Sequence, residues 1–139
     1  MSTERTFAMI KPDATRRHLV GQILEMAGAA GLHVRAMKRL RLDDQDASLM
    51  YAEHEGKSWL PEQIAYMTSG AVVAIVFEGQ DAITRWRALM GPTDHTKAPA
   101  GTIRNKFAIS YRENSVHGSD SPEAANREIP LFFASSEIA

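Results

Sequence analysis

The alternation of apolar and polar residues predicts three strands in the first part of the chain. Even positions from 32 to 42 are mostly apolar and odd positions mostly polar, a period of two that is typical of a half-buried strand. RTFAMI at 5–10 is a second short apolar run, and the following Lys11–Asp13 segment predicts a turn because Pro12 cannot donate to a sheet. AVVAIVF at 71–77 is rich in β-branched residues and predicts a central strand covered on both faces.

Helical spacing of apolar residues appears between and after these runs. It predicts helices over 19–27 with Gly31 as the stop, from Asp43 and Asp44 toward His54, over 61–67 with Pro61 first, from Ile83 to Met90, and from about Ser121 onward. The segment PTDHTKAPAG at 92–101 has no periodic pattern and predicts a long exposed loop. This order of elements predicts an α+β sandwich with one sheet backed by helices.

Composition narrows the class of protein. A chain of 139 residues with 44% hydrophobic residues fits a single domain over 1–139 with its own core. It has no cysteine, which excludes disulfides and thiolate metal sites, and its apolar runs are too short to span a bilayer, so we expect a soluble, cytoplasmic protein. A net charge of -1 argues against general attraction to nucleic acid or membrane, so any anion site must be built locally.

One histidine is a candidate nucleophile. Gly56-Lys57-Ser58 resembles the end of a P-loop, but the first glycine of that motif would fall at Tyr51, and no pair of histidines has metal-binding spacing. His117, in NSVHGSD, is followed by Gly118, which leaves room for an incoming tetrahedral group, and by Ser119, which can form a hydrogen bond. Glu128, on the next predicted helix, would fix the ring tautomer. Spacing alone fits a structural histidine equally well.

The segment NSVHGSDS resembles the active-site signature of the nucleoside diphosphate kinases. Further segments resemble that family in the same order along nearly the whole chain: ERTFAMIKPD, YAEH, YMTSG, RALMGPT, GTIR and REI. The resemblance implies a ferredoxin-like α+β sandwich with a four-stranded antiparallel sheet backed by helices. It also implies a ping-pong enzyme that moves the γ-phosphoryl of a nucleoside triphosphate onto a histidine and then onto a nucleoside diphosphate, with Mg²⁺ as cofactor.

The resemblance also implies residue roles at the reacting end of the site. His117 would be the nucleophile through Nδ1, with Glu128 and Ser119 orienting its ring. Lys11 would contact the ribose hydroxyl and the phosphate, and Tyr51 would support the site beside it. Phosphoryl transfer depends mainly on positioning and on neutralising phosphate charge, which suits these residue types.

The remaining implied roles concern nucleotide binding. Arg87, Thr93 and Arg104 would hold the phosphates and Asn114 the sugar 3′-hydroxyl. Trp59 stands where the family usually has phenylalanine, and a base stacked on it would be accepted whatever its identity. Mg²⁺ would be held mainly by the phosphates and water, so no metal-ligand motif is expected. The implied partners are nucleoside di- and triphosphates and copies of the chain itself, in a tetramer or hexamer built from dimers, without nucleic acid or membrane.

Three departures from the family pattern raise specific expectations. Asp94-His95 replaces the common AsnPro, which adds a negative charge and frees the loop backbone, and Asn105-Lys106 replaces an acidic residue. Pro130 lies in the last predicted helix, where a kink would move Glu128. Two rival functions are a regulatory nucleotide-binding protein with weak or no catalysis and a nucleic-acid-binding module. The presence of His117 disfavours the regulatory protein. The nearly neutral net charge disfavours the nucleic-acid-binding module.

Overall fold

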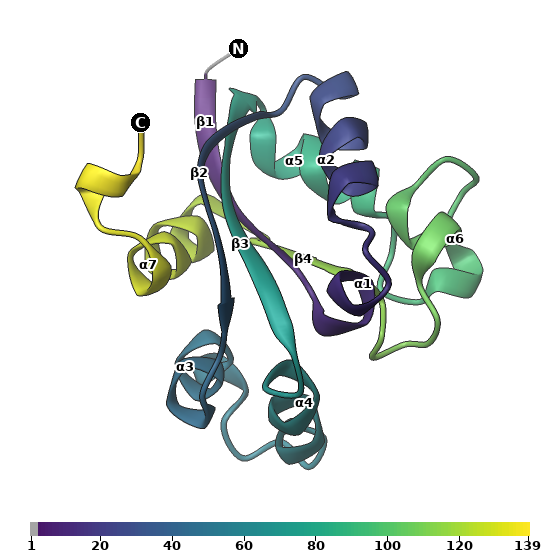
Figure 1. Cartoon of the computed structure of the whole chain (residues 1–139), viewed down its shortest axis with the longest axis vertical. Coiled ribbons are helices and arrows are strands. Elements are labelled where there is room, and N and C mark those ends of the chain that lie inside the picture. Colours follow the sequence, from purple (N-terminus) through teal and green to yellow (C-terminus); the bar gives the residue numbers. More distant parts are fainter. Residues whose placement is uncertain (1–2) are drawn as a thin grey trace.

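The computed structural model describes residues 3–139 and contains one four-stranded sheet (Figure 1). Its strands are β1 (Thr3–Ile10), β2 (His33–Arg41), β3 (Ala71–Gln80) and β4 (Val116–Gly118). The strand order is β2-β3-β1-β4, and each neighbouring pair is antiparallel. The four-stranded antiparallel sheet is therefore confirmed, and β4, which carries His117, pairs with β1 at one edge.

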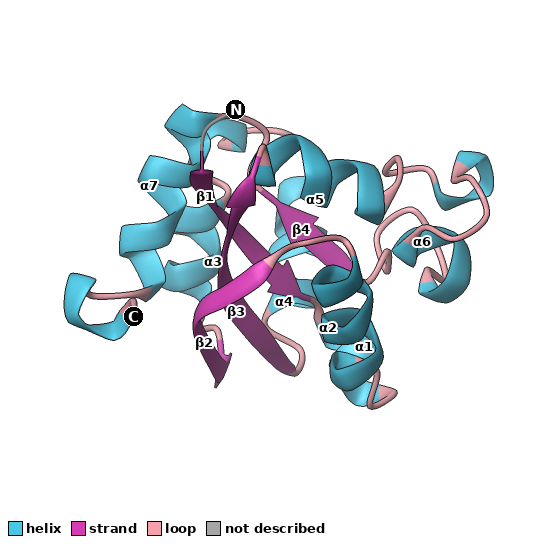
Figure 2. Cartoon of the chain, turned by 90° about the horizontal axis from the view of Figure 1, so that it is seen from above, coloured by secondary structure: helices cyan, strands magenta, loops and turns pink. Residues whose placement is uncertain are grey.

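Helices cover both faces of the sheet (Figure 2). On one face, α1 (Pro12–Arg16), α2 (Val20–Ala29), α5 (Ala82–Met90) and α6 (Ile103–Phe107) share a buried cluster with alternate strand residues. On the other face, α3 (Asp44–Met50), α4 (Leu60–Met67) and α7 (Pro122–Phe132) share a second cluster.

The central strand β3 contributes to both clusters. Val73, Ile75 and Phe77 belong to the first cluster, whereas Val72, Ala74 and Val76 belong to the second. Because successive side chains of a strand point to opposite faces, burial on both sides requires an uninterrupted apolar run. The prediction of a central strand from AVVAIVF is confirmed, and β3 extends three residues further, to Gln80.

A β-bulge interrupts the alternation in β2. Val34 pairs with Phe77, but Ala36 pairs with Val76, so one extra residue lies on the β2 side. The extra residue changes which face the even positions occupy. Val34 is consequently 45% exposed, although the period of two predicted it inside, while Ala36 is buried.

Several predicted boundaries were wrong. The Lys11–Asp13 segment is not a simple turn, because Pro12 begins the short helix α1 and its fixed φ suits a first helical position. The helix predicted to run toward His54 ends at Met50 and is followed by a 3₁₀ turn over Ala52–His54. The next helix, α4, begins at Leu60, one residue before Pro61.

The segment predicted as a long loop contains local structure of its own. His95–Lys97 forms a 3₁₀ turn, capped by the Asp94 carboxylate, which accepts from the Thr96 backbone N–H and hydroxyl. These hydrogen bonds hold the pKa of Asp94 below its ordinary value. The helix α6 that follows was not predicted, since five residues are too few for a periodic pattern. Asn105 ties α6 back to the loop by donating to the Ala98 carbonyl.

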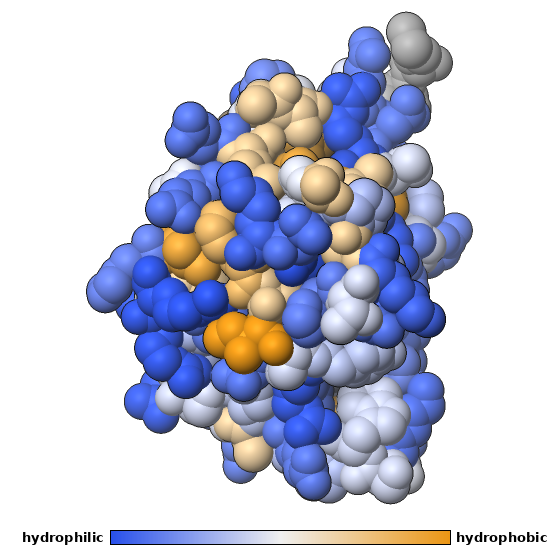
Figure 3. All heavy atoms as spheres, turned by 90° about the vertical axis from the view of Figure 1, so that its right-hand side faces the viewer, coloured by the Kyte–Doolittle hydropathy of each residue, from blue (hydrophilic) through white to orange (hydrophobic). Residues whose placement is uncertain are grey.

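The last helix, α7, runs past Pro130 to Phe132, and the chain ends after a further 3₁₀ turn over Ser135–Glu137. Ser121 caps α7 by accepting from the Ala124 N–H. On the side where α6 lies in Figure 1, hydrophilic side chains surround smaller apolar areas (Figure 3). No helix among residues 3–139 is long and apolar enough to cross a membrane.

Candidate active site

The predicted site residues converge on one cleft of about 900 Å³. Those that line it are Lys11, Tyr51, Trp59, Arg87, Thr93, Arg104, Asn114, His117 and Glu128. Ser119 is buried behind the cleft wall and contacts Glu128. The cleft thus gathers Lys11, which directly follows β1, with residues from β4, α5, α6 and α7 and from the arm formed by α3, α4 and the segment between them.

His117 is held by a carboxylate on one ring nitrogen. Its Nε2 lies 2.7 Å from Glu128 Oε1, and the Ser119 hydroxyl donates to the same oxygen at 3.3 Å. An ionised carboxylate only accepts hydrogen bonds, so Nε2 carries the proton and the neutral ring has its lone pair on Nδ1. Within residues 3–139, Nδ1 makes no hydrogen bond, and the ring lines the cleft. This geometry leaves Nδ1 available as a nucleophile.

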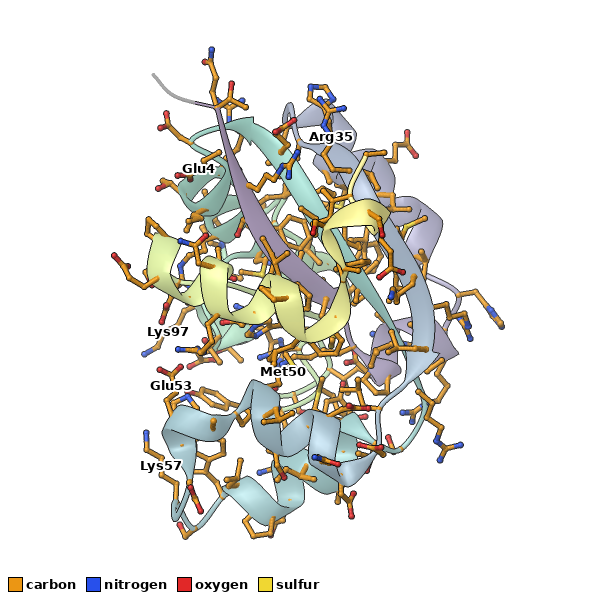
Figure 4. The ribbon with its side chains drawn as sticks, turned by 90° about the vertical axis from the view of Figure 1, so that its left-hand side faces the viewer. Glu4, Arg35, Met50, Glu53, Lys57 and Lys97 are labelled. Atoms are coloured by element: carbon orange, nitrogen blue, oxygen red, sulfur yellow. The ribbon has the colours of Figure 1, made fainter. Side chains whose placement is uncertain are left out.

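Glu128 is buried, and α7 holds it in place despite Pro130. Its second oxygen, Oε2, lies 3.4 Å from Arg127 Nη2, and the same nitrogen lies 3.5 Å from Glu53 Oε1. Figure 4 shows Glu53 on the side of the α3–α4 arm that faces α7, with Lys57 further away. Because the 2.7 Å contact with His117 is intact, the proline does not move Glu128 away from the ring.

Gly118 does not provide room for the incoming group in the way the sequence suggested. A Cβ built on Gly118 would lie 2.4 Å from Trp86 Cδ1 and 2.9 Å from Met90 Cε, so its missing side chain faces buried helix α5. Trp86 Nε1 donates to the His117 carbonyl at 3.1 Å. Gly118 therefore lets the indole approach the β4 backbone and fix the strand that carries His117.

Lys11 is buried beside Asn114. Its Nζ donates to Asn114 Oδ1 at 2.9 Å, and Asn114 Nδ2 donates to the Tyr111 carbonyl. Burial, followed by repulsion from Arg104, lowers the pKa of Lys11 to about 7, and attraction from Asp13 opposes the change. An anion in the cleft would restore the charge of this ammonium.

The backbone before His117 is strained and held by Asp13, a residue that the sequence did not single out. Ser115 has φ +76°, a left-handed value that is uncommon for a residue with a Cβ. Its N–H and hydroxyl both donate to the Asp13 carboxylate, and its carbonyl accepts from the Lys11 N–H at 2.8 Å. Tyr66 and Arg17 also donate to Asp13. These bonds fix the turn that aims Asn114 and His117 into the cleft.

Arg104 is both a structural and a cleft-lining residue. Its guanidinium donates to the carbonyls of Gly91, Asn114 and Val116, at 2.9, 3.3 and 2.8 Å. A guanidinium has five N–H donors, so two remain for a ligand. Burial, followed by repulsion from Arg87, lowers the pKa of Arg104 to about 10, so the group stays cationic. Two neighbouring arginines and Lys11 make this end of the cleft attractive to a polyanion.

The other end of the cleft is aromatic. The Trp59 side chain is 40% exposed, and its ring lies 5.1 Å from that of His54. Tyr111, which the sequence did not identify, lines the same cleft and is 68% exposed. Exposed aromatic faces beside a cationic cleft suit a ligand with a planar ring at one end and negative charge at the other.

Comparison with known proteins identifies the family. The sequence profile described as "Nucleoside diphosphate kinase" matches residues 4–138. The chain belongs to the nucleoside diphosphate kinase family. A curated nucleoside diphosphate kinase from Hydrogenovibrio crunogenus is 53% identical over 135 residues, which span 97% of this chain and 96% of that protein. The resemblance seen in the sequence is confirmed, and the chain is an enzyme, a nucleoside diphosphate kinase.

Solved nucleoside diphosphate kinases share the whole fold. The enzyme from Aquifex aeolicus superposes with a TM-score of 0.96 at 38% identity, covering 99% of this chain and all of that one. A Halobacterium salinarum enzyme, solved in complex with CDP, gives 0.95 at 41% identity and covers 99% of this chain and 92% of that one. An Encephalitozoon cuniculi enzyme without ligand gives 0.94 at 35% identity, covering 98% and 92%.

Proposed function

We propose that the chain carries out nucleoside diphosphate kinase chemistry through a phosphohistidine on His117. The observation that supports this most directly is the contact of His117 Nε2 with Glu128, which leaves Nδ1 facing the cleft. In the first half-reaction Nδ1 attacks the γ-phosphorus, an N–P bond forms, and the bond to the β–γ bridging oxygen breaks. The nucleoside diphosphate formed in this step leaves. A second nucleoside diphosphate then binds and takes the phosphoryl group from Nδ1 by the reverse steps.

Glu128 and Ser119 would serve the step by orienting the ring. As the N–P bond forms, positive charge develops on the imidazole, and the carboxylate at Nε2 stabilises it. The Ser119 hydroxyl keeps Glu128 Oε1 in line with the ring by donating to it. Neither residue exchanges a proton with the nucleotide in this scheme.

The cationic groups would hold the phosphates, with Arg87, Arg104 and Thr93 at the phosphate end. Lys11 and Asn114, linked by their 2.9 Å hydrogen bond, would contact the sugar hydroxyl and phosphate together. We also propose Mg²⁺ as cofactor, held mainly by phosphate oxygens and water. Carboxylates of Glu53 and Asp120 line the cleft and offer the oxygen chemistry that suits a hydrated Mg²⁺. When bound, the ion would neutralise charge on the phosphates.

Steady-state kinetics test this scheme. Initial rates are measured at several concentrations of ATP and of a nucleoside diphosphate acceptor. A ping-pong enzyme gives parallel double-reciprocal lines, because the phosphoryl group is bound covalently to the protein between the two half-reactions. Intersecting lines would point instead to direct transfer between two bound nucleotides.

Trp59 is proposed to stack the base, which leads to a prediction about specificity. Trp59→Ala should raise the Kd of ADP, GDP and CDP alike, by about tenfold, since stacking on an aromatic ring is worth about 1–3 kcal/mol for any base. Equilibrium titration of the three diphosphates measures this. An effect confined to one base would contradict stacking.

Lys11 should make nucleotide binding pH-dependent. With a pKa of about 7, Lys11 is mostly neutral in the free enzyme at pH 8, and bound phosphates favour its charged form. Binding of Mg²⁺-ATP at pH 8 should therefore take up as much as about one proton per site, and the uptake should fall below pH 6.5. Calorimetry in buffers of different ionisation enthalpy measures this. Equal uptake by Lys11→Met would contradict the assignment.

We further propose that copies of the chain assemble into a tetramer or hexamer built from dimers. The edge strand β2 supports an assembly because it exposes Val34 and Met37, and an uncovered edge favours pairing with another chain.

We also propose that residues 1–139 form one domain, since both apolar clusters share one sheet. A cytoplasmic location is proposed from the absence of cysteine and the absence of membrane-length apolar runs in the sequence.

A further inference from the structure

Tyr51 is connected to a pair of polar residues outside the predicted site. Gln63 Nε2 donates to Tyr51 Oη at 3.0 Å, and Arg112 Nε donates to Gln63 Oε1 at 3.1 Å. Gln63 is buried on α4, whereas Arg112 lies in the segment between α6 and β4, and both side chains line the cleft. The three residues therefore form one chain of hydrogen bonds across the cleft wall.

The chemistry of arginine fixes the direction of every bond in this chain. A guanidinium only donates, so the atom of Gln63 that faces Arg112 must be its carbonyl oxygen. The amide nitrogen of Gln63 then faces Tyr51, and the phenol oxygen must accept from it. The Tyr51 proton, which conjugation keeps near the plane of the ring, is left for the other side of the oxygen.

The remaining side of the Tyr51 hydroxyl is the cleft. Tyr51 lines the cleft with Lys11, His117 and Glu128, and within residues 3–139 its hydroxyl donates to no acceptor. Burial raises the pKa of Tyr51 to about 12, so the group keeps its proton at any physiological pH. Arg112 is itself held, since its Nη1 donates to Glu62 at 2.8 Å.

We propose that Arg112 and Gln63 are positioning residues that fix the Tyr51 hydroxyl as a donor into the cleft, where it donates to an oxygen of the transferred phosphoryl group. This inference rests on the proposed phosphohistidine chemistry of the same site. The pair links the Tyr51 donor to α4, which begins directly after the base-stacking Trp59, and to the segment that carries Tyr111.

Reversing the hydrogen bond tests the inference. In Gln63→Glu, Arg112 keeps the new carboxylate ionised, and the carboxylate accepts the Tyr51 proton and turns it away from the cleft. The rate of phosphohistidine formation, measured in a single turnover at saturating Mg²⁺-ATP, should fall about tenfold, to the level of Tyr51→Phe. Gln63→Leu, which frees the hydroxyl without reversing it, should lose about two- to threefold.

Double variants with Tyr51→Phe distinguish a positioning role of Gln63 from general damage to the site. Adding Gln63→Glu or Gln63→Leu to Tyr51→Phe should cost nothing further, because the hydroxyl that Gln63 orients is already gone. Gln22→Glu, an exposed substitution of the same kind on α2, is the matched control and should keep the wild-type rate. Where Gln63→Glu does not fold, Gln63→Leu in both backgrounds gives the same test.

A wild-type rate for both Gln63 variants, or losses that persist in full on top of Tyr51→Phe, would overturn the inference. These results are distinct from failure of the proposed function. If the wild-type protein forms no phosphohistidine at all, the proposed function fails first, whereas a normal wild-type rate with unaffected Gln63 variants removes only the positioning role.

Discussion

Replacing His117 with alanine is expected to lower nucleoside diphosphate kinase turnover at least about a thousandfold, because a covalent mechanism has no substitute for its nucleophile. Nucleotide affinity should change little, since Lys11, Arg87, Arg104 and Trp59 remain. Coupled assay of GTP formation and titration with ADP measure the two quantities separately. The side chain lies only partly buried at the cleft, so the fold should tolerate its removal.

His33→Ala is the matched control for this experiment. His33 is exposed at the start of β2 and does not line the cleft, so its removal should leave turnover unchanged. Turnover near the wild-type value in His117→Ala would refute the assignment of the nucleophile. Loss of turnover together with loss of ADP binding would show that the histidine supports the site rather than the chemistry.

Gly118→Ala is expected to destabilise the protein by about 3 kcal/mol, as overpacking of a filled core does. The added methyl would lie 2.4 and 2.7 Å from Cδ1 and Nε1 of Trp86, which is fully buried and cannot swing away. Either the indole or β4 must shift, and a shift of β4 breaks the bond from Trp86 to the His117 carbonyl. Urea unfolding measures the stability, and activity should fall with it.

Gly28→Ala is the control for this experiment, because it is expected to raise the stability of the protein. Gly28 lies in α2, and a Cβ there meets no atom within 4 Å, so alanine should raise the free energy of unfolding by up to about 1 kcal/mol. If Gly118→Ala were as stable as the wild type, the close packing of Trp86 against β4 would be wrong.

The parts of the fold that the sequence predicted well are those with a long, simple pattern. The buried strand β3 and the amphipathic helix α5 were found because burial on two faces or one face leaves a direct trace in the residue order. The bulge in β2 could not be found, since one extra residue changes the face of Val34 without altering the alternation itself. Helix α6, which Thr102 caps, was missed because it forms only about one and a half turns, too few for a periodic pattern of apolar residues.

The site was reached differently from the fold. Periodicity and spacing marked His117 as a candidate, with Ser119 and Glu128 as its partners, but left a structural histidine open. The remaining site residues came from the family resemblance. Residues that act through another side chain could not be found from local spacing, because their partners are distant in the sequence. Asp13 binds Ser115, 102 positions away, and Arg112 binds Gln63, 49 positions away. Gly118 was assigned the wrong purpose, because a sequence shows that a side chain is missing but not which neighbour occupies the space.

The central claim, a phosphohistidine on His117, is tested most directly by incubating the protein with Mg²⁺ and γ-labelled ATP and removing free nucleotide. The label on the protein should be acid-labile and alkali-stable, should map to His117, and should pass into GTP when GDP is added. Absence of label from a protein that still binds ADP, or label that GDP cannot remove, would contradict the account.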